Sequence, residues 1–461
     1  MNEKFVHTAY KGNVKIAVCY GESYKAGMSS LAYQKLIELF LSEDFFMSRF
    51  FFEKNTVYSP DNFFKLNQAN IIVFTISFEP DVINALKMLL LSNVELENAR
   101  RKQTLICGGI LPTLNPKLLE TVFDFQYFGE IEGNENKIRQ ILKIKSKTEI
   151  LDSLNSAFGK NIQKAEEKAP PPHSVILSSD TIFNDAFLVE ISRGCKFNCP
   201  FCLIGSYYPD FRQWPFETLC NIIDTGLKYS SKIGLVSALP NSHSDILKIV
   251  EYILKKGGKP SFSSIRLELI TEEFIKILKS SGQNTLTIAP ETADIEVRKK
   301  IGKVYTDEKI INILNLSLKH GIHNFKLYFM AGLPGDINAE NEIIKLCKKI
   351  REQLLIYAKK TGIMPGLSLD ISLFVPKPGT KWENEIMQNE VFYKNFINNI
   401  NKNLAPLGIK TKKDNYNISI SQYVLSRIDS KYLKEIITLL KDNKPIKRKL
   451  KLIFKEIKNT L

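Results

Sequence analysis

The 461-residue chain lacks several features that would place it in common protein classes. No run approaches the roughly 20 consecutive apolar residues that a membrane-spanning helix needs, and residues 1–12 contain no apolar core of the kind found in a secretory signal. The seven cysteines are an odd number spread over a long chain, which does not suit a disulfide framework. We therefore expect a cytoplasmic protein in a reducing compartment.

A fourth cysteine is also missing from the place where three others gather. Cys195, Cys199 and Cys202 follow a buried-looking strand directly, and the Gly, Asn and Pro residues around them are typical of a tight loop. Cubane iron–sulfur clusters are normally held by four thiolates. Three thiols at this spacing therefore predict a [4Fe–4S] cluster with one iron open to a small molecule.

Structural zinc is the main alternative for these thiols. Such a site usually has four Cys or His ligands, and the nearby candidates for the fourth are His173, His243 and Cys220. The C-x₃-C-x₂-C spacing favours the open cluster over zinc.

The middle of the chain alternates between strand-like and helical patterns. Six strand–helix units in series predict a parallel sheet that curls into a partial (β/α)₆ barrel over residues 186–376. Active sites of such barrels gather at the C-terminal strand ends, which is the edge where the three-cysteine loop begins. The predicted strands are 186–191, 232–236, 263–269, 285–289, 325–331 and 367–375, with helices over 216–227, over 246–254 and after Thr271.

The flanking regions differ from this barrel. Residues 1–135 predict a small doubly wound, flavodoxin-like α/β domain, residues 136–185 are polar and predict a linker, and residues 377–461 are mostly helical. The N-terminal domain has expected strands at 14–19, 71–76, 104–107 and 123–128 and expected helices at 29–41 and 81–91.

The net charge of +15 allows a second function class. Clustered Lys and Arg neutralise nucleic-acid phosphates, and residues 441–461 are rich in Lys. Leu450, Ile453, Phe454, Ile457 and Leu461 recur at helical spacing, which favours a terminal helix docked by its apolar stripe. An RNA-binding or RNA-modifying protein remains the alternative hypothesis.

The C-x₃-C-x₂-C motif after the first strand of a six-unit barrel resembles the radical S-adenosylmethionine (SAM) superfamily. The resemblance implies that Cys195, Cys199 and Cys202 ligate a single [4Fe–4S] cluster whose open iron binds SAM. It also implies a low-potential electron donor of flavodoxin or ferredoxin type and cleavage of SAM to a 5′-deoxyadenosyl radical. The barrel would then enclose the substrate in a dry interior lined by its apolar strands.

The resemblance assigns further residues to SAM. It counts Phe201 among the cofactor-binding residues, and it places Glu291 and Arg298 near the ribose and carboxylate and Gly332 against the adenine. A Gly-Gly-Glu segment common in the family is replaced by residues 237–240, so Ser237 is only a candidate for the SAM amino group. The segment Phe374–Thr380, with Trp382, resembles the one that closes the barrel.

The N-terminal domain resembles cobalamin-binding domains that precede many of these barrels. The positions that match their cobalamin-binding pattern are Tyr24, Gly27, Ser77, Gly108 and Gly109. Tyr24 stands where those domains have the axial His, and a phenol at its usual pKa is a poor cobalt ligand. Two interpretations stay open: cobalamin bound without a protein ligand, or an α/β domain that only packs.

The leading hypothesis from the sequence is a radical SAM enzyme. The resemblance to cobalamin-dependent members extends it to methyl transfer onto an unactivated carbon. The sequence does not name the substrate.

Overall fold

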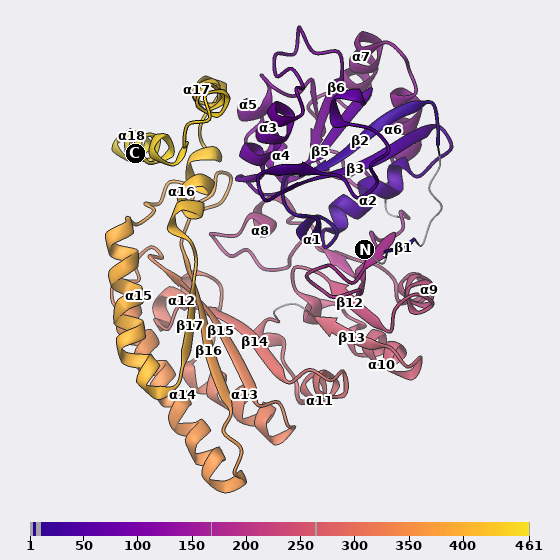
Figure 1. The fold of residues 1–461 in the computed structure, drawn as a ribbon. Coiled ribbons are helices and arrows are strands. Elements are labelled where there is room, and N and C mark those ends of the chain that lie inside the picture. The colour runs from indigo at the N-terminus through magenta and orange to yellow at the C-terminus, as the bar shows by residue number, and fades with distance from the viewer. Residues whose placement is uncertain (1–2, 6–10, 167, 263–264, 461) are drawn as a thin grey trace. The chain divides into compact units, whose positions relative to one another are not determined.

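The computed structural model describes residues 3–5, 11–166, 168–262 and 265–460. The chain divides into two compact units, which Figure 1 shows as a ribbon. Unit 1 combines Met1–Leu188 with Ile420–Thr460, and unit 2 is Val189–Ser419. No helix in the described part of the chain is both long and apolar enough to cross a bilayer.

Unit 1 is built on a six-stranded sheet with the order β4-β3-β2-β5-β6-β7. All neighbours are parallel except β3 and β4. The parallel strands follow the 2-1-3-4-5 order of flavodoxin-like folds, so the predicted fold class is confirmed. The strands are β2 (Val14–Tyr20), β3 (Phe45–Glu53), β4 (Thr56–Tyr58), β5 (Ile71–Thr75), β6 (Thr104–Gly108) and β7 (Phe125–Gln126).

Helices cover both faces of this sheet, as its near-continuous apolar strands require. A separate pair of short antiparallel strands, β1 (Glu3–Phe5) and β8 (Ile176–Ser178), also belongs to unit 1. The helices of the N-terminal part are α1 (Tyr24–Gly27), α2 (Leu31–Phe40), α3 (Asp81–Leu91), α4 (Ile110–Leu114), α5 (Pro116–Leu119), α6 (Glu135–Leu142) and α7 (Lys147–Ala157).

Strand β3 was not predicted, although it is the most aromatic strand of the sheet. Its sequence FFMSRFFFE is buried along almost its whole length, because a strand between two others with both faces covered shows no alternation. Phe51 is fully buried and makes edge-to-face contacts with Tyr24 and Tyr33 at 5.2 and 5.3 Å between ring centroids.

The linker predicted for residues 136–185 is wrong. Helices α6 and α7 occupy much of it, and Ile138, Ile141, Ile150 and Leu154 are part of the hydrophobic core of unit 1. Four apolar side chains at helical spacing are enough to bury one face of each helix, even though most of their neighbours are polar.

The C-terminal boundary also differs from the prediction, because residues 420–460 belong to unit 1 rather than to a segment of their own. Asn115 donates two hydrogen bonds to the carbonyls of Leu425 and Ile428, at 3.1 and 2.8 Å. The expected docked terminal helix is confirmed by Leu450, Ile453 and Phe454, which are buried, whereas Leu461 of the predicted stripe lies outside the described residues. The helices here are α16 (Tyr416–Leu425), α17 (Ser430–Lys441) and α18 (Lys447–Thr460).

Unit 2 contains the predicted open barrel, in two sheets. The first has the order β13-β12-β9 and the second the order β14-β15-β16-β17, and an isolated bridge between Ile265 and Ile288 joins their neighbouring edges. The strands are β9 (Phe187–Glu190), β12 (Lys232–Val236), β13 (Lys259–Phe262), β14 (Thr285–Glu291), β15 (Asn324–Ala331), β16 (Gly366–Leu373) and β17 (Lys410–Lys413).

Five of the six predicted barrel strands are confirmed, and the third is misplaced. The described strand is β13, whereas Leu267–Leu269 forms a 3-10 turn and residues 263–264 lie outside the described residues. The main helices of this unit are α9 (Phe216–Leu227), α10 (Ile246–Lys255), α11 (Glu272–Ser280), α12 (Ile295–Lys300), α13 (Asp307–Lys319), α14 (Ala339–Thr361) and α15 (Glu390–Leu404).

We expect Phe51→Ala to lower the free energy of unfolding of unit 1 by about 3–5 kcal/mol, because it leaves a cavity among packed rings. The matched control is Phe63→Ala, since Phe63 is 48% exposed and surface changes stay within about 0.5 kcal/mol. Urea unfolding followed by near-ultraviolet circular dichroism measures both. Equal effects from the two variants would contradict the assigned core.

Candidate functional site

The three-cysteine loop is held closed by its own backbone. It follows β9 and the short strand β10 (Ser192–Arg193), and helix α8 (Leu203–Tyr207) begins directly after Cys202. The N–H of Cys195 donates to the carbonyl of Tyr208 at 3.3 Å, and that of Cys202 donates to the carbonyl of Cys199 at 3.0 Å. Both ends of the loop are therefore fixed, and the three thiols come from one short, wound segment.

The thiols are free of disulfides and close enough to influence one another. Cys199 is buried and the other two are partly exposed. Burial raises the pKa of Cys195, and the charges of the other two sulfurs raise it further. The N–H of Phe197, which donates to the Cys195 sulfur at 3.4 Å, lowers this pKa. Ligation by iron would overcome this cost, since a coordinating thiol is deprotonated outright.

The donor set of this loop consists of three cysteine thiols from one short segment. Among the described residues, no three His, Cys, Asp or Glu side chains are grouped so that they could hold one metal ion. A cubane spreads its thiolates over several irons, so it does not need them around one point. His243 was one candidate for the fourth ligand of a zinc site. Both of its ring nitrogens are engaged, one with the carbonyl of Trp214 and the other with the N–H of Asp245, each at 3.1 Å.

An aromatic cluster connects the loop to the predicted closing segment. The ring of Trp382 lies 6.3 Å from that of Phe201 and 5.8 Å from that of Phe374. The N–H of Trp382 donates to the carbonyl of Pro200 at 3.1 Å. The segment that ends the barrel in sequence thus packs on the thiol loop in space, and Phe201 lies in this contact.

Glu291, the predicted ribose ligand, is held in an unusual conformation at the end of β14. Its φ is +67°, and the register of β14 against β15 shifts just before it. The ammonium of Lys303 pairs with its carboxylate at 2.7 Å. A non-glycine residue at positive φ costs free energy and occurs where the surrounding structure imposes it, often at functional sites. Lys303 was not identified from the sequence, because nothing in the pattern predicts that this turn returns to the strand end.

Arg298 has a different environment from the one predicted. Its side chain is fully buried, and its three nitrogens donate to the carbonyls of Thr292 and Tyr305 and to Asp307, at 3.0 to 3.2 Å. These partners lie within its own helix–loop segment and anchor the start of α13. A direct contact with the SAM carboxylate stays a prediction, and the observed contacts favour a structural role.

Ser237 and Gly332 also have partners of their own in this structure. The hydroxyl of Ser237 lies 2.6 Å from that of Ser192 and accepts from the N–H of Leu239 at 3.1 Å. A side chain at Gly332, where φ is +82°, would come within 2.7 Å of Gln388. Both positions lie at C-terminal strand ends, and their roles toward SAM stay predictions.

The expected apolar lining of the barrel is wrong for the second sheet. Phe325, Leu327 and Phe329 of β15 are buried, whereas the alternate residues Lys326 and Tyr328 are only partly buried. Lys326 contacts Asp370 of β16 at 3.0 Å and the hydroxyl of Tyr328 at 3.1 Å. Helices α13 to α15 cover one side of this sheet (Figure 1), so the apolar residues face the helices and the polar residues face the interior.

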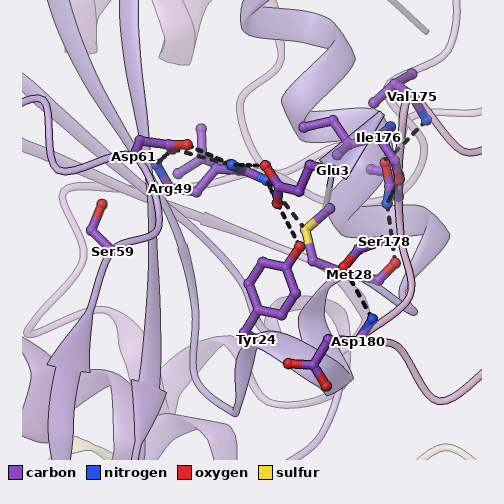
Figure 2. A network of polar contacts seen from close by, with 12 residues as sticks. Glu3, Tyr24, Met28, Arg49, Ser59, Asp61, Val175, Ile176, Ser178 and Asp180 are labelled. Atoms are coloured by element: carbon purple, nitrogen blue, oxygen red, sulfur yellow. Dashed lines mark hydrogen bonds and ion pairs between the residues drawn. The ribbon is translucent and has the colours of Figure 1, made fainter. Parts of the chain in front are cut away.

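The Tyr24 position of the N-terminal domain is filled by a buried polar network (Figure 2). The hydroxyl of Tyr24 donates to Glu3 at 2.5 Å, and Glu3 pairs with Arg49 at 2.8 Å. Arg49 is almost fully buried and also pairs with Asp61. Burial is the largest cause that raises the pKa of Tyr24 well above its usual value, and the hydrogen bond to the carboxylate of Glu3 raises it further. The phenol is therefore neutral and already engaged, which agrees with the interpretation that it is no cobalt ligand.

The other positions of the cobalamin pattern are explained in part by packing. A side chain at Gly27 would come within 2.5 Å of the Phe51 ring, and one at Gly109, where φ is +102°, within 2.5 Å of the Ile76 carbonyl. Ser77 is exposed just after β5, and Gly108 has space around it. The residues at this sheet edge therefore agree with both interpretations from the sequence, cobalamin bound without a protein ligand and a domain that only packs.

Comparison with known proteins identifies the family. Residues 189–347 match the family model described as "Radical SAM superfamily", and residues 38–162 match the model "Radical SAM proteins, N-terminal". The chain contains radical SAM superfamily domains. The family's [4Fe–4S] cluster and SAM are its cofactors.

Curated relatives and solved structures match over different shares of this radical SAM protein. "Uncharacterized protein MJ0966" of Methanocaldococcus jannaschii is 27% identical over 91% of the chain and 90% of the relative. "Uncharacterized methyltransferase PH0819" of Pyrococcus horikoshii is 27% identical over 50% of the chain and 48% of the relative. The structure of the radical SAM methyltransferase TsrM from Kitasatospora setae, with cobalamin and a [4Fe–4S] cluster bound, aligns with a TM-score of 0.49 and 11% identity, over 81% of this chain and 77% of that one.

We expect Cys195→Ala, Cys199→Ala and Cys202→Ala each to lose most of the iron bound after anaerobic reconstitution, because each would remove one of three ligands. Cys220→Ala is the matched control, since Cys220 lies on α9 outside the loop. Iron and sulfide analysis per chain measures the result, with about four irons expected in the control. A cluster that survives in any of the three loop variants would contradict the ligand assignment.

Proposed function

We propose that the chain cleaves SAM with a single [4Fe–4S] cluster held by Cys195, Cys199 and Cys202 and uses the resulting 5′-deoxyadenosyl radical on a polar substrate. The observation that carries this is the closed loop of three free thiols at the C-terminal end of β9. When bound, the reduced cluster supplies the electron that breaks the sulfonium bond of SAM.

Three of the four cysteines outside the loop support a single cluster. Cys19, Cys107 and Cys347 are fully buried, and burial raises the pKa of each thiol. They lie on β2, β6 and α14. Buried thiols with raised pKa values are inert core residues rather than metal ligands.

The chain's own residues prepare the site before SAM arrives. Lys303 orients the carboxylate of Glu291, which can accept hydrogen bonds from two ribose hydroxyls. The contacts among Phe201, Phe374 and Trp382 close the loop side against water. Exclusion of water matters here because a carbon radical reacts with whatever lies near it.

The interior of the barrel supports a polar substrate. Lys326, Tyr328 and Asp370 form one hydrogen-bonded group on the interior face of β15 and β16. Opposite charges on this face suit a substrate with hydrogen-bonding or charged groups better than an apolar one.

The protein reconstituted without oxygen should release 5′-deoxyadenosine and methionine from SAM when dithionite or reduced flavodoxin is supplied. Liquid chromatography with mass detection measures both products. The triple variant Cys195→Ala, Cys199→Ala, Cys202→Ala should release neither product. A preparation that carries four irons but leaves SAM intact under reducing conditions would overturn the proposal.

Cobalamin-dependent methyl transfer to an unactivated carbon is the second candidate function. The flavodoxin-like strand order of unit 1 and the methyltransferase name of the Pyrococcus relative favour it. It predicts S-adenosylhomocysteine among the products, in addition to 5′-deoxyadenosine. An RNA substrate stays a prediction, and the apolar stripe of α18 gives the basic tail a packing role in unit 1.

Titration with hydroxocobalamin should give a one-to-one complex whose spectrum shows no His or Tyr ligand from the protein. Tyr24→Phe should leave that spectrum unchanged, because the Tyr24 hydroxyl is engaged by Glu3. Gel filtration and absorbance measure retention and ligation together. Failure to retain any corrinoid would favour a domain that only packs, and a spectral change in Tyr24→Phe would contradict the assigned network.

A further inference from the structure

Arg266 is a buried cation that touches one of the three cluster thiols. It is 6% exposed and immediately precedes the turn Leu267–Leu269. Its Nη1 lies 3.7 Å from the Sγ of Cys199, within the longer range of hydrogen bonds to sulfur. No motif in the sequence identified it, because it lies more than sixty residues after the thiols and in no recognisable pattern.

The position of its backbone is fixed from the neighbouring strand end. The N–H of Arg266 donates to Oδ1 of Asn241 at 3.1 Å, and Nδ2 of Asn241 donates to the Arg266 carbonyl at 2.8 Å. Asn241 is itself buried. This two-way clamp sets where the side chain begins.

The guanidinium is fixed as well. Its carbon lies 3.5 Å from the centroid of the Phe197 ring, which is part of the thiol loop. Nε and Nη2 donate to Oε1 of Glu268, at 3.1 and 2.8 Å, and Nη2 also donates to the carbonyl of Gly302. Because Nε and Nη2 are engaged by these partners, Nη1 is the nitrogen that is directed at the sulfur of Cys199.

We propose that Arg266 is a positioning residue that donates to the Cys199 sulfur and raises the reduction potential of the cluster. The inference rests on the proposed function, since it needs the cluster to be present. Hydrogen bonds to cluster sulfurs and nearby charge set the potential of such centres. Reduction adds negative charge, so a buried cation beside the cluster stabilises the reduced state more than the oxidised one.

The same residue connects the two halves of the site. Gly302, which accepts from Arg266, adjoins Lys303, and Lys303 pairs with Glu291. One continuous set of contacts therefore runs from Cys199 through Arg266 and the 302–303 turn to the carboxylate predicted to bind the SAM ribose. Arg266 thereby fixes the thiol loop relative to the end of β14.

The test compares Arg266→Gln with Arg266→Lys and with a matched control, Arg351→Gln. Arg351 lies on α14 of the same unit and is also buried, with 5% of its surface exposed. Its Nη1 donates a hydrogen bond to the carbonyl of Pro365. Each protein is reconstituted, its iron is counted, and its midpoint potential is measured by redox titration with electron paramagnetic resonance detection. Thermal unfolding reports any general loss of stability.

Arg266→Gln should load iron and show a lower midpoint potential than the wild type, and Arg266→Lys should lie between them. Arg351→Gln should unfold at a lower temperature than the wild type, and the midpoint potential of its cluster should be unchanged. A midpoint in loaded Arg266→Gln equal to that of the wild type would overturn the proposal and leave Arg266 purely structural.

Glu268→Gln provides a second route if Arg266→Gln does not load iron. Glu268 neutralises part of the Arg266 charge, so its removal should shift the midpoint upward, and an unchanged or lower midpoint would also overturn the proposal. Failure of the wild type to hold any cluster would instead overturn the proposed function.

Discussion

The site depends on one constraint: three thiols must be held by a loop that cannot relax. The backbone bonds at Cys195 and Cys202, the helix that begins after Cys202, and the aromatic contact of Phe201 all serve this purpose. A preformed loop loses little conformational freedom when ligands bind. Elements far apart in sequence contribute, since Trp382 belongs to the segment that ends the barrel.

Polar contacts then organise the strand ends around that loop. Arg266 and Lys303, two cations that no motif identifies, hold Cys199 and Glu291 respectively. Arg298, whose contact with SAM stays a prediction, stabilises its own helix–loop segment. The partners of these three cations differ from what the sequence suggested, because burial and neighbouring groups decide what a cation does.

The N-terminal domain shows how a fold can persist while one position changes its chemistry. Its strand order is that of flavodoxin-like domains, yet Tyr24 joins Glu3, Arg49 and Asp61 in a closed network (Figure 2). A buried Arg paired with two carboxylates would be costly to separate. This network makes the position part of the core rather than a ligand to a metal.

The thiol motif, the family resemblance and most strands and helices could be predicted from the amino-acid sequence, because these depend on local spacing and hydrophobic period. Helices α9 and α10 begin and end within a residue of their predicted limits. Strand β3 and the helices of the supposed linker were missed, since a doubly covered strand shows no alternation and short amphipathic helices among lysines resemble a polar connection.

Which charged side chains meet becomes visible only in the folded chain. Arg266 reaches Cys199, Lys303 reaches Glu291, and Lys326 reaches Asp370. Each of these pairs joins residues from different elements or turns, and sequence spacing does not encode such proximity. The polar interior of the barrel has the same origin: alternation along a strand shows that it has two faces, but only the packing of the helices shows which face is inside.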